Sequence, residues 1–199
     1  MAKKDQSRGG TVLKTYRLSG RVKEGEPPIK GKIDVNWLLC TGCRLCEHAC
    51  SVKHEGHILH DASRIRVLQF DPGPLDIPVL CHQCWDFPCI EACPVKPKVL
   101  SLDEVNGNLH VDIERCLGEK CGLCAKACHH RSAIWFHPKS RKAMVCDLCG
   151  GEPECSRICP TGCLSFLPGA SFNGVHYAKS PEMIADSLAK RFLPAKRMV

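Results

Sequence analysis

Seventeen cysteines in a chain of 199 residues constrain its fold more than any other feature of the sequence. This density is far above average usage, so either disulfides or metal-bound thiolates must account for it. The odd count and the short spacings favour reduced thiolates, which persist in the cytoplasm, over a disulfide framework. We therefore expect a cytoplasmic protein in which cysteines bind metal.

The sequence shows no segment that would direct the chain into or across a membrane. Its first residues are charged and precede no apolar stretch, and no twin-arginine pair occurs there, so we expect no export signal. No apolar run approaches the ~20 residues that span a bilayer. We expect any membrane contact to go through a partner.

The cysteines form four groups, in each of which three lie close together and a fourth follows after three intervening residues. Three thiolates on a tight loop can take three corners of one cubane iron–sulfur cluster, while the fourth, a helical turn further on, points away and ligates the other cluster of a pair. Zinc ribbons also use a lone C-x2-C, but four copies of this pattern favour iron–sulfur ligation. The groups are Cys40, Cys43, Cys46 and Cys50; Cys81, Cys84, Cys89 and Cys93; Cys116, Cys121, Cys124 and Cys128; and Cys146, Cys149, Cys155 and Cys159.

The third group departs in two places from the bacterial ferredoxin motif C-x2-C-x2-C-x3-C-P. Two extra residues follow Cys116, and His129 replaces the closing proline that the second and fourth groups have as Pro94 and Pro160. The second and fourth groups also contain an enlarged loop, so we still expect a [4Fe–4S] cluster here. Zinc or an atypical cluster is the alternative at this site.

The formal charge of +7 suggests nucleic-acid binding until the cofactors are counted. Sixteen cysteines bound as thiolates to four cubane cores of about +2 each would lower the net charge to about −1. The basic residues then mostly balance the cofactors. A zinc-binding nucleic-acid or scaffold module is the alternative from another functional class.

Between the groups the sequence predicts short strands. Apolar and polar residues alternate in "KVLSLDEVNGNLHVDIERC", on both sides of Asn106-Gly107, and in "AIWFHPKSRKAMVC", so each segment is expected to form a β-hairpin. The segment Ser51–Pro78 is expected to be an irregular insertion. These elements predict an α+β fold with little apolar core, stabilised largely by metal ligation.

The C-terminal tail predicts a helix near residues 181–193, with Ser180 as its N-cap. Ile184, Leu188 and Phe192 share one face of this helix. That face is expected to pack either on the chain's own domain or on a partner subunit.

The spacing of the cysteines resembles that of the four-cluster ferredoxin-like electron-transfer subunits that accompany molybdenum and tungsten enzymes. The resemblance spans residues 35–167 and implies two interlaced bacterial-ferredoxin-like folds, with an N-terminal extension over residues 1–34 and a C-terminal extension over residues 168–199. In that family the first and fourth groups exchange their last cysteines, and so do the second and third.

Carried over to this sequence, the resemblance implies four [4Fe–4S] clusters. Zinc is the alternative only for the last of the four ligand sets. These sets would be Cys40, Cys43, Cys46 and Cys159; Cys146, Cys149, Cys155 and Cys50; Cys81, Cys84, Cys89 and Cys128; and Cys116, Cys121, Cys124 and Cys93.

The short chain and compact spacings are most similar to the small subunits of cytoplasmic tungsten enzymes of the aldehyde oxidoreductase type, including that of class II benzoyl-CoA reductase. The resemblance implies a hetero-oligomer without nucleic acid. In it, the chain would relay single electrons between a tungsten- or molybdenum-containing catalytic subunit and a further redox subunit or ferredoxin. No Rossmann fingerprint, P-loop or nucleophile triad occurs, so we expect no catalytic site in this chain.

A few further residues have the chemistry of a site. Cys163 is expected to be a small buried thiol, because the four ligand sets are already complete. The histidines of "HEGHILH", residues 54–60, are expected to face solvent. For His129 and His130 the alternatives are a capping or surface role and a role as metal ligand or hydrogen-bond donor to a cluster sulfur.

Overall fold

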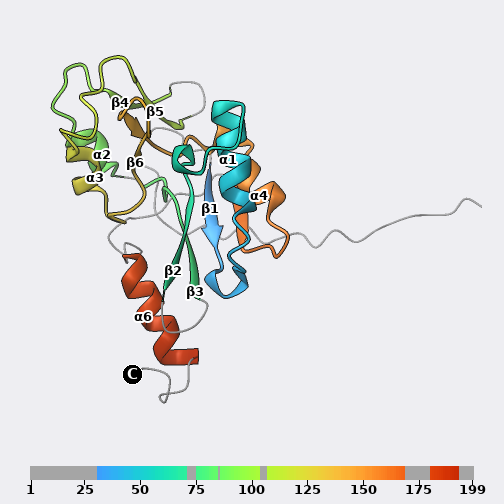
Figure 1. The fold of residues 1–199 in the computed structure, drawn as a ribbon. Coiled ribbons are helices and arrows are strands. Elements are labelled where there is room, and N and C mark those ends of the chain that lie inside the picture. Colours follow the sequence, from blue (N-terminus) through green and yellow to red (C-terminus); the bar gives the residue numbers. More distant parts are fainter. Residues whose placement is uncertain (1–30, 71–74, 85, 104–106, 169–179, 193–199) are drawn as a thin grey trace, which may run out of the picture.

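The computed structural model describes residues 31–70, 75–84, 86–103, 107–168 and 180–192. Four two-stranded antiparallel sheets and several short helices make up this part of the chain, which confirms the α+β class (Figure 1). The strand pairs are β1 (Gly31–Val35) with β8 (Leu164–Pro168), β2 (Arg66–Phe70) with β3 (Leu75–Val79), β4 (Leu100–Leu102) with β5 (Leu109–Val111), and β6 (Trp135–Phe136) with β7 (Ala143–Met144). The helices are α1 (Leu45–Glu55), α2 (Pro88–Glu91), α3 (Leu123–Ala127), α4 (Glu154–Ile158) and α6 (Pro181–Phe192), with 3-10 turns η1 (Trp37–Leu39), η2 (His60–Ala62) and η3 (Leu148–Gly151).

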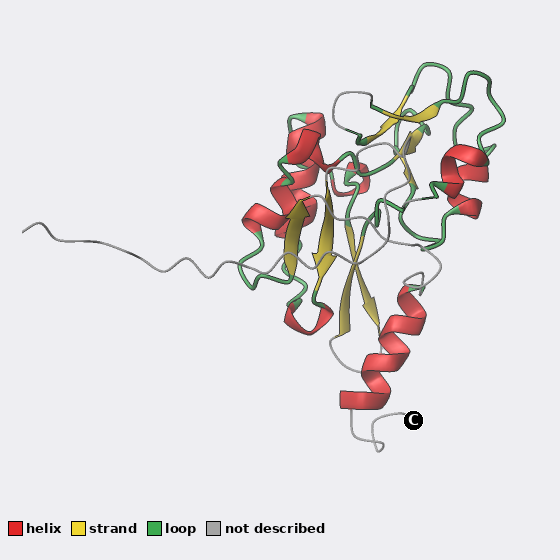
Figure 2. Cartoon of the chain, turned by 180° about the vertical axis from the view of Figure 1, so that it is seen from behind, coloured by secondary structure: helices red, strands yellow, loops and turns green. Residues whose placement is uncertain are grey.

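The helices that follow the cysteine loops form two pairs on opposite sides of the molecule. Helix α1 packs against α4, and α2 packs against α3. Figure 2 shows the same two pairs from behind, with the short strands between them. The first and fourth cysteine groups are thereby brought together, as are the second and third.

Strands β1 and β8 join the two ends of the cysteine-rich region. They pair from Gly31 opposite Pro168 to Val35 opposite Leu164. The predicted boundary between residues 34 and 35 therefore falls inside a strand, because the pairing with β8 extends to Gly31.

Both predicted hairpins are confirmed. Leu100 lies opposite Val111 in the first hairpin, and Trp135 lies opposite Met144 in the second. The turn residues 104–106, which include Asn106, lie outside the described residues, as does the N-terminal extension before residue 31.

The expectation that Ser51–Pro78 is irregular is wrong. Helix α1 continues to Glu55, and β2 and β3 form a third hairpin in which Val67 lies opposite Pro78. The proline within "LDIPV" argues against a strand in the sequence, because proline is rare inside strands. It is tolerated because in a two-stranded sheet each strand is an edge, where a missing N–H need not break a ladder.

The main core is built largely from cysteines and aliphatic side chains of the strands and loops. Ile33, Leu80, Val99 and Leu148 are almost completely buried there, and nine of the cysteines are themselves buried. The core residues therefore surround the thiols. The thiols occupy the space that apolar side chains fill in an ordinary domain.

A second, smaller core lies beneath α6, and it answers whether this helix packs on its own chain. The predicted helix is confirmed, and Ser180 Oγ accepts the Met183 N–H at 3.4 Å. Ile184 is 5% exposed and packs with Ile77 of β3, whereas Phe192 in the last turn is 52% exposed. Helix α6 thus covers the β2–β3 hairpin. Among the described helices, none has the length and apolar character to cross a membrane.

Candidate metal centres

All seventeen cysteines lie in the described part of the chain, and all are free thiols. The thiols are not scattered, because the folding of the four groups gathers them into four sets.

Site 1 lies between α1 and α4. Its cavity has a volume of about 310 Å³ and is lined by Cys40, Cys43, Cys46 and Cys159, with Cys163 beside them. Three of these cysteines come from the first group and one from the fourth. This is the set that the resemblance implies for one cluster.

Site 2 is lined by residues of the same two helices, α1 and α4. Its cavity of about 300 Å³ is lined by Cys50, Cys146, Cys149 and Cys155. The fourth group supplies three thiols and the first group supplies the last, so the two groups exchange their final cysteines across the α1–α4 contact.

Site 4 lies in the half of the molecule formed by α2 and α3. Its cavity of about 330 Å³ is lined by Cys93, Cys116, Cys121 and Cys124. This is the site of the atypical third group. Its cavity is as large as those of sites 1 and 2.

Site 3 comprises Cys81, Cys84, Cys89 and Cys128, whose thiols lie close enough to affect one another's charge. Burial and, to a smaller extent, the nearby Cys128 together raise the pKa of Cys84 to about 12. Burial likewise raises the pKa of Cys89 to about 12, with additional contributions from Cys128 and Cys84. The pKa of Cys81 is raised by burial and then by Cys89 and Cys84.

These sets suit a positively charged metal core. Burial also raises the pKa of Cys46 to about 12 and that of Cys124 to about 11, and in both cases neighbouring thiolates add to the increase. Several thiolates cannot share such a site without a compensating cation, whereas a coordinated thiol loses its proton outright. An all-sulfur set of four is the ligand set of iron–sulfur clusters and also of structural zinc.

The electrostatic contacts also order the four sites. Burial is the main cause that raises the pKa of Cys155 in site 2, and Cys46 of site 1 is among the neighbouring thiols that add to the increase. Cys81 of site 3 raises that of Cys146 in site 2, after the larger effect of burial. Cys124 of site 4 contributes in the same way to Cys89 of site 3. Neighbouring sites therefore follow the order 1, 2, 3, 4.

Left-handed backbone residues before the helices shape the cysteine loops. Arg44 precedes α1 with φ 60°, Phe87 precedes α2 with φ 36°, and Gly122 precedes α3 with φ 58°. Each lies between the second and third cysteines of its group, where it turns the chain sharply. Non-glycine residues rarely adopt this conformation, and they cluster at functional sites.

Backbone N–H groups point at several of the sulfurs. Arg64 N–H lies 3.2 Å from Cys50 Sγ, and Gly118 N–H lies 3.3 Å from Cys116 Sγ. Hydrogen bonds of this kind stabilise the added negative charge of a reduced cluster and so raise its potential.

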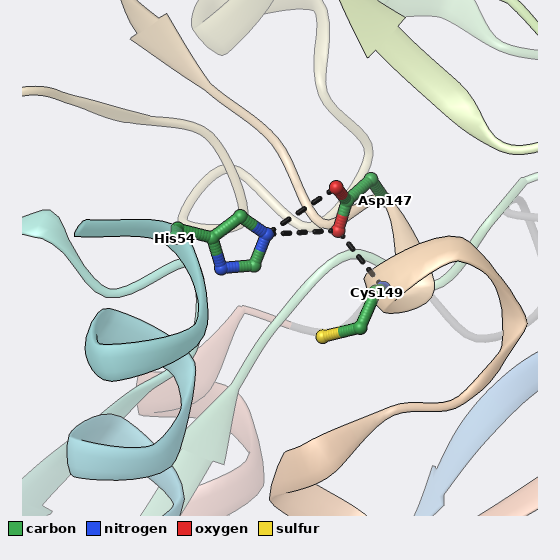
Figure 3. A group of neighbouring side chains, drawn as sticks. All are labelled: His54, Asp147 and Cys149. Carbon is green, nitrogen blue, oxygen red and sulfur yellow. Dashed lines mark hydrogen bonds and ion pairs between the residues drawn. The ribbon is translucent and has the colours of Figure 1, made fainter. Parts of the chain in front are cut away.

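Sequence reasoning missed the environment of His54. This residue does not face solvent as expected: its side chain is only 13% exposed and lies between Cys50 and Asp147 (Figure 3). Burial alone would lower the pKa of His54, but hydrogen bonds with Asp147 and Cys50 raise it to about 10. The signal available in the sequence was the i, i+4 spacing from Cys50, which places both residues on one face of a helix.

His129 and His130 have different surroundings. His129 Nε2 lies 2.7 Å from Asp86 Oδ2. His130 is 3% exposed and stacks on His82 with 4.4 Å between ring centroids. A surface role for His130 is therefore wrong, and neither histidine lines the cavities of sites 1, 2 or 4.

Cys163 is 2% exposed, as expected for a buried thiol, but it is not remote from the metal sites. It lines the cavity of site 1. A hydrogen bond from Cys163 lowers the pKa of Cys40 to about 7. The seventeenth cysteine thus contacts a predicted ligand.

No family model matches the chain. The polyferredoxin-like subunit of an aliphatic sulfonate oxidoreductase from Pyrococcus furiosus is 45% identical over 129 residues, which cover 62% of this chain and 70% of the relative. A putative electron transport protein from Escherichia coli is 36% identical over 64% of this chain and 83% of the relative. A polysulfide reductase subunit from Wolinella succinogenes is 31% identical over 64% of this chain and 71% of the relative.

Among solved structures, the BamBC active-site complex of benzoyl-CoA reductase with benzoyl-CoA contains a chain that is 24% identical, with 81% of this chain and 90% of that chain covered and a TM-score of 0.41. A likeness of this size carries no argument about function. The relatives in sequence are decisive, because each is similar over more than two thirds of its own length. The chain belongs to the family of polyferredoxin-like electron-transfer subunits of oxidoreductases.

Proposed function

We propose that this chain relays single electrons through four [4Fe–4S] clusters held in sites 1 to 4. One observation carries the proposal: the cavities of sites 1, 2 and 4 are each lined by three cysteines of one group and the last cysteine of another, with Cys163 as a fifth thiol at site 1. Groups distant in the sequence would not exchange single thiols if each folded around its own zinc ion. When bound, the clusters supply the one-electron chemistry, and the chain supplies ligands, hydrogen bonds and burial.

The proposed ligands are the sets already implied by the resemblance. The domain that holds them would run from Gly31 to Pro168, since β1 pairs with β8 over these residues. At site 4 we favour [4Fe–4S] over zinc because its lining has the same arrangement as at sites 1 and 2, three cysteines of one group and the last cysteine of another. The sets are Cys40, Cys43, Cys46 and Cys159; Cys146, Cys149, Cys155 and Cys50; Cys81, Cys84, Cys89 and Cys128; and Cys116, Cys121, Cys124 and Cys93.

Electrons would enter and leave at sites 1 and 4. These sites lie at the two ends of the order inferred from the electrostatic contacts, and each has exposed groups at its cavity. Cys43 is exposed at site 1, where Leu45 is 37% exposed. Leu117 lines the cavity of site 4 and is 60% exposed. Apolar side chains beside a terminal site are suitable contacts for partner proteins.

The partners would be a catalytic subunit that contains tungsten or molybdenum and a second redox subunit or ferredoxin, within a cytoplasmic hetero-oligomer. The support is the cysteine pattern, which resembles subunits of aldehyde oxidoreductase-type enzymes, including class II benzoyl-CoA reductase. The Pyrococcus relative is itself a subunit of an aliphatic sulfonate oxidoreductase. Substrate chemistry would belong to the catalytic subunit, and this chain would have no catalytic site of its own.

Metal content tests the proposal. Protein purified without oxygen should be brown and carry about sixteen irons per chain, and dithionite should produce the electron paramagnetic resonance (EPR) signals of reduced cubanes. A colourless protein that contains only zinc would contradict the relay. A content of about twelve irons and one zinc per chain would be consistent with a relay of three clusters and would assign the zinc to site 4. The variant Cys121→Ala would check this assignment, because it should then lose the zinc and no iron.

A further inference from the structure

A histidine–aspartate pair lies in the wall of site 2. His54 comes from the last turn of α1, one helical turn after Cys50, and Asp147 follows Cys146 directly. Both side chains line the cavity. Figure 3 shows the ring of His54 directed from α1 towards the carboxylate of Asp147, which also faces the backbone of Cys149.

The distances define a continuous chain of hydrogen bonds. His54 Nε2 lies 3.1 Å and 3.3 Å from the two carboxylate oxygens of Asp147. On the other side of the ring, Nδ1 lies 2.8 Å from the carbonyl oxygen of Cys50 and 3.9 Å from its Sγ. Asp147 Oδ1 also accepts the N–H of Cys149 at 2.9 Å.

The polar atoms that lie at hydrogen-bond distance from the two ring nitrogens are all acceptors. A carboxylate lies at one nitrogen, and a carbonyl oxygen and a cysteine sulfur lie at the other, so both nitrogens must donate to satisfy them. The ring therefore directs an N–H towards Cys50 in the wall of the cavity. Asp147 fixes the ring in this orientation, as carboxylates do for histidines at metal sites.

A separate metal ion bound by this pair is a poorer explanation. The ligand atoms of His54, Asp147 and Cys149 do lie within 4.8 Å of one another. Such an ion would compete with site 2 for Cys149, which lines the cavity beside three other thiols. It would also take the nitrogen that already bonds to Asp147.

We propose that His54, oriented by Asp147, raises the reduction potential of the cluster in site 2. This inference rests on the proposed function. An N–H directed at a ligand cysteine stabilises the reduced cluster, which carries one more negative charge. His54 is a positioning residue that acts through Cys50.

Two substitutions in the full-length protein, purified without oxygen, test this role. His54→Leu removes the hydrogen-bond donor, whereas His54→Gln keeps one. In a redox titration followed by EPR, one reduction step should move to a more negative potential, further for leucine than for glutamine. The other steps should stay in place. His57→Leu is the matched control, because His57 is an exposed neighbour outside the cavity.

The outcomes separate this inference from the relay itself. Wild-type protein without iron–sulfur signals would refute the proposed function before His54 is considered. Full iron content with no shift in either variant would overturn the role of His54. If His54→Leu loses the cluster of site 2, the reduction potential of His54→Gln becomes the test. An unchanged potential in His54→Gln would then overturn the proposal.

Discussion

Cys163 contacts Cys40 in site 1, yet site 1 already has four other thiols. We expect Cys163→Ala to keep about sixteen irons, because a cubane has only four corners for protein ligands. Loss of a buried side chain of this size should cost about 1 kcal/mol of stability. Iron analysis and thermal unfolding without oxygen would measure both effects.

Cys159→Ala is the matched control, since Cys159 also lines site 1 and lies on the same loop. It should lose the cluster of site 1 and therefore about four irons. If Cys163→Ala lost iron while Cys159→Ala did not, the ligand set of site 1 would have to include Cys163 in place of Cys159.

At this scale the sequence predicts the thiols but not their neighbours. The spacing of the cysteines was enough to name sixteen candidate ligands, because a loop followed by a helical turn has few geometries. His54 escaped prediction because its partner Asp147 is distant in the sequence, and only the packing of α1 beside the fourth group brings them together. The burial of His130 depends on contacts of the same long-range kind.

Helix α6 lies outside the cysteine groups, and its contribution to the stability of the domain can be measured. Ile184 is 5% exposed against the β2–β3 hairpin, whereas the adjacent Met183 is 57% exposed. Ile184→Ala should destabilise the iron-loaded protein by about 2–5 kcal/mol through the cavity it leaves. Met183→Ala should change stability by less than about 0.5 kcal/mol. Equal thermal midpoints for the two variants would show that α6 does not stabilise the domain.

Elements differ in how well their local pattern predicts them. The hairpins β4–β5 and β6–β7 were predictable because their strands alternate apolar and polar residues. Strand β3 was not, since Pro78 breaks the usual strand signal and is tolerated only in an edge position. The face of α6 was predicted in part: Ile184 is buried, but Phe192 lies at the exposed end of the helix.

The whole molecule has a core in which buried thiols replace aliphatic side chains. We therefore expect removal of iron by a chelator to abolish cooperative unfolding, because metal binding and folding are coupled in such proteins. Far-ultraviolet circular dichroism during heating would show a broad, shallow change in place of a transition. A mock-treated sample without chelator should keep its transition, and an unchanged midpoint in the iron-free chain would contradict this expectation.

The exchange of last cysteines has a consequence for biosynthesis. A ribosome releases Cys40 early, but the cavity of site 1 needs Cys159, and site 2 needs Cys155. With the proposed ligand sets, sites 3 and 4 would be complete as soon as Cys128 has emerged. Domains can fold while synthesis continues, so the middle of this chain is ready for iron first. The two sites whose cysteines span both ends of the domain must wait, and a truncated chain could never be fully loaded.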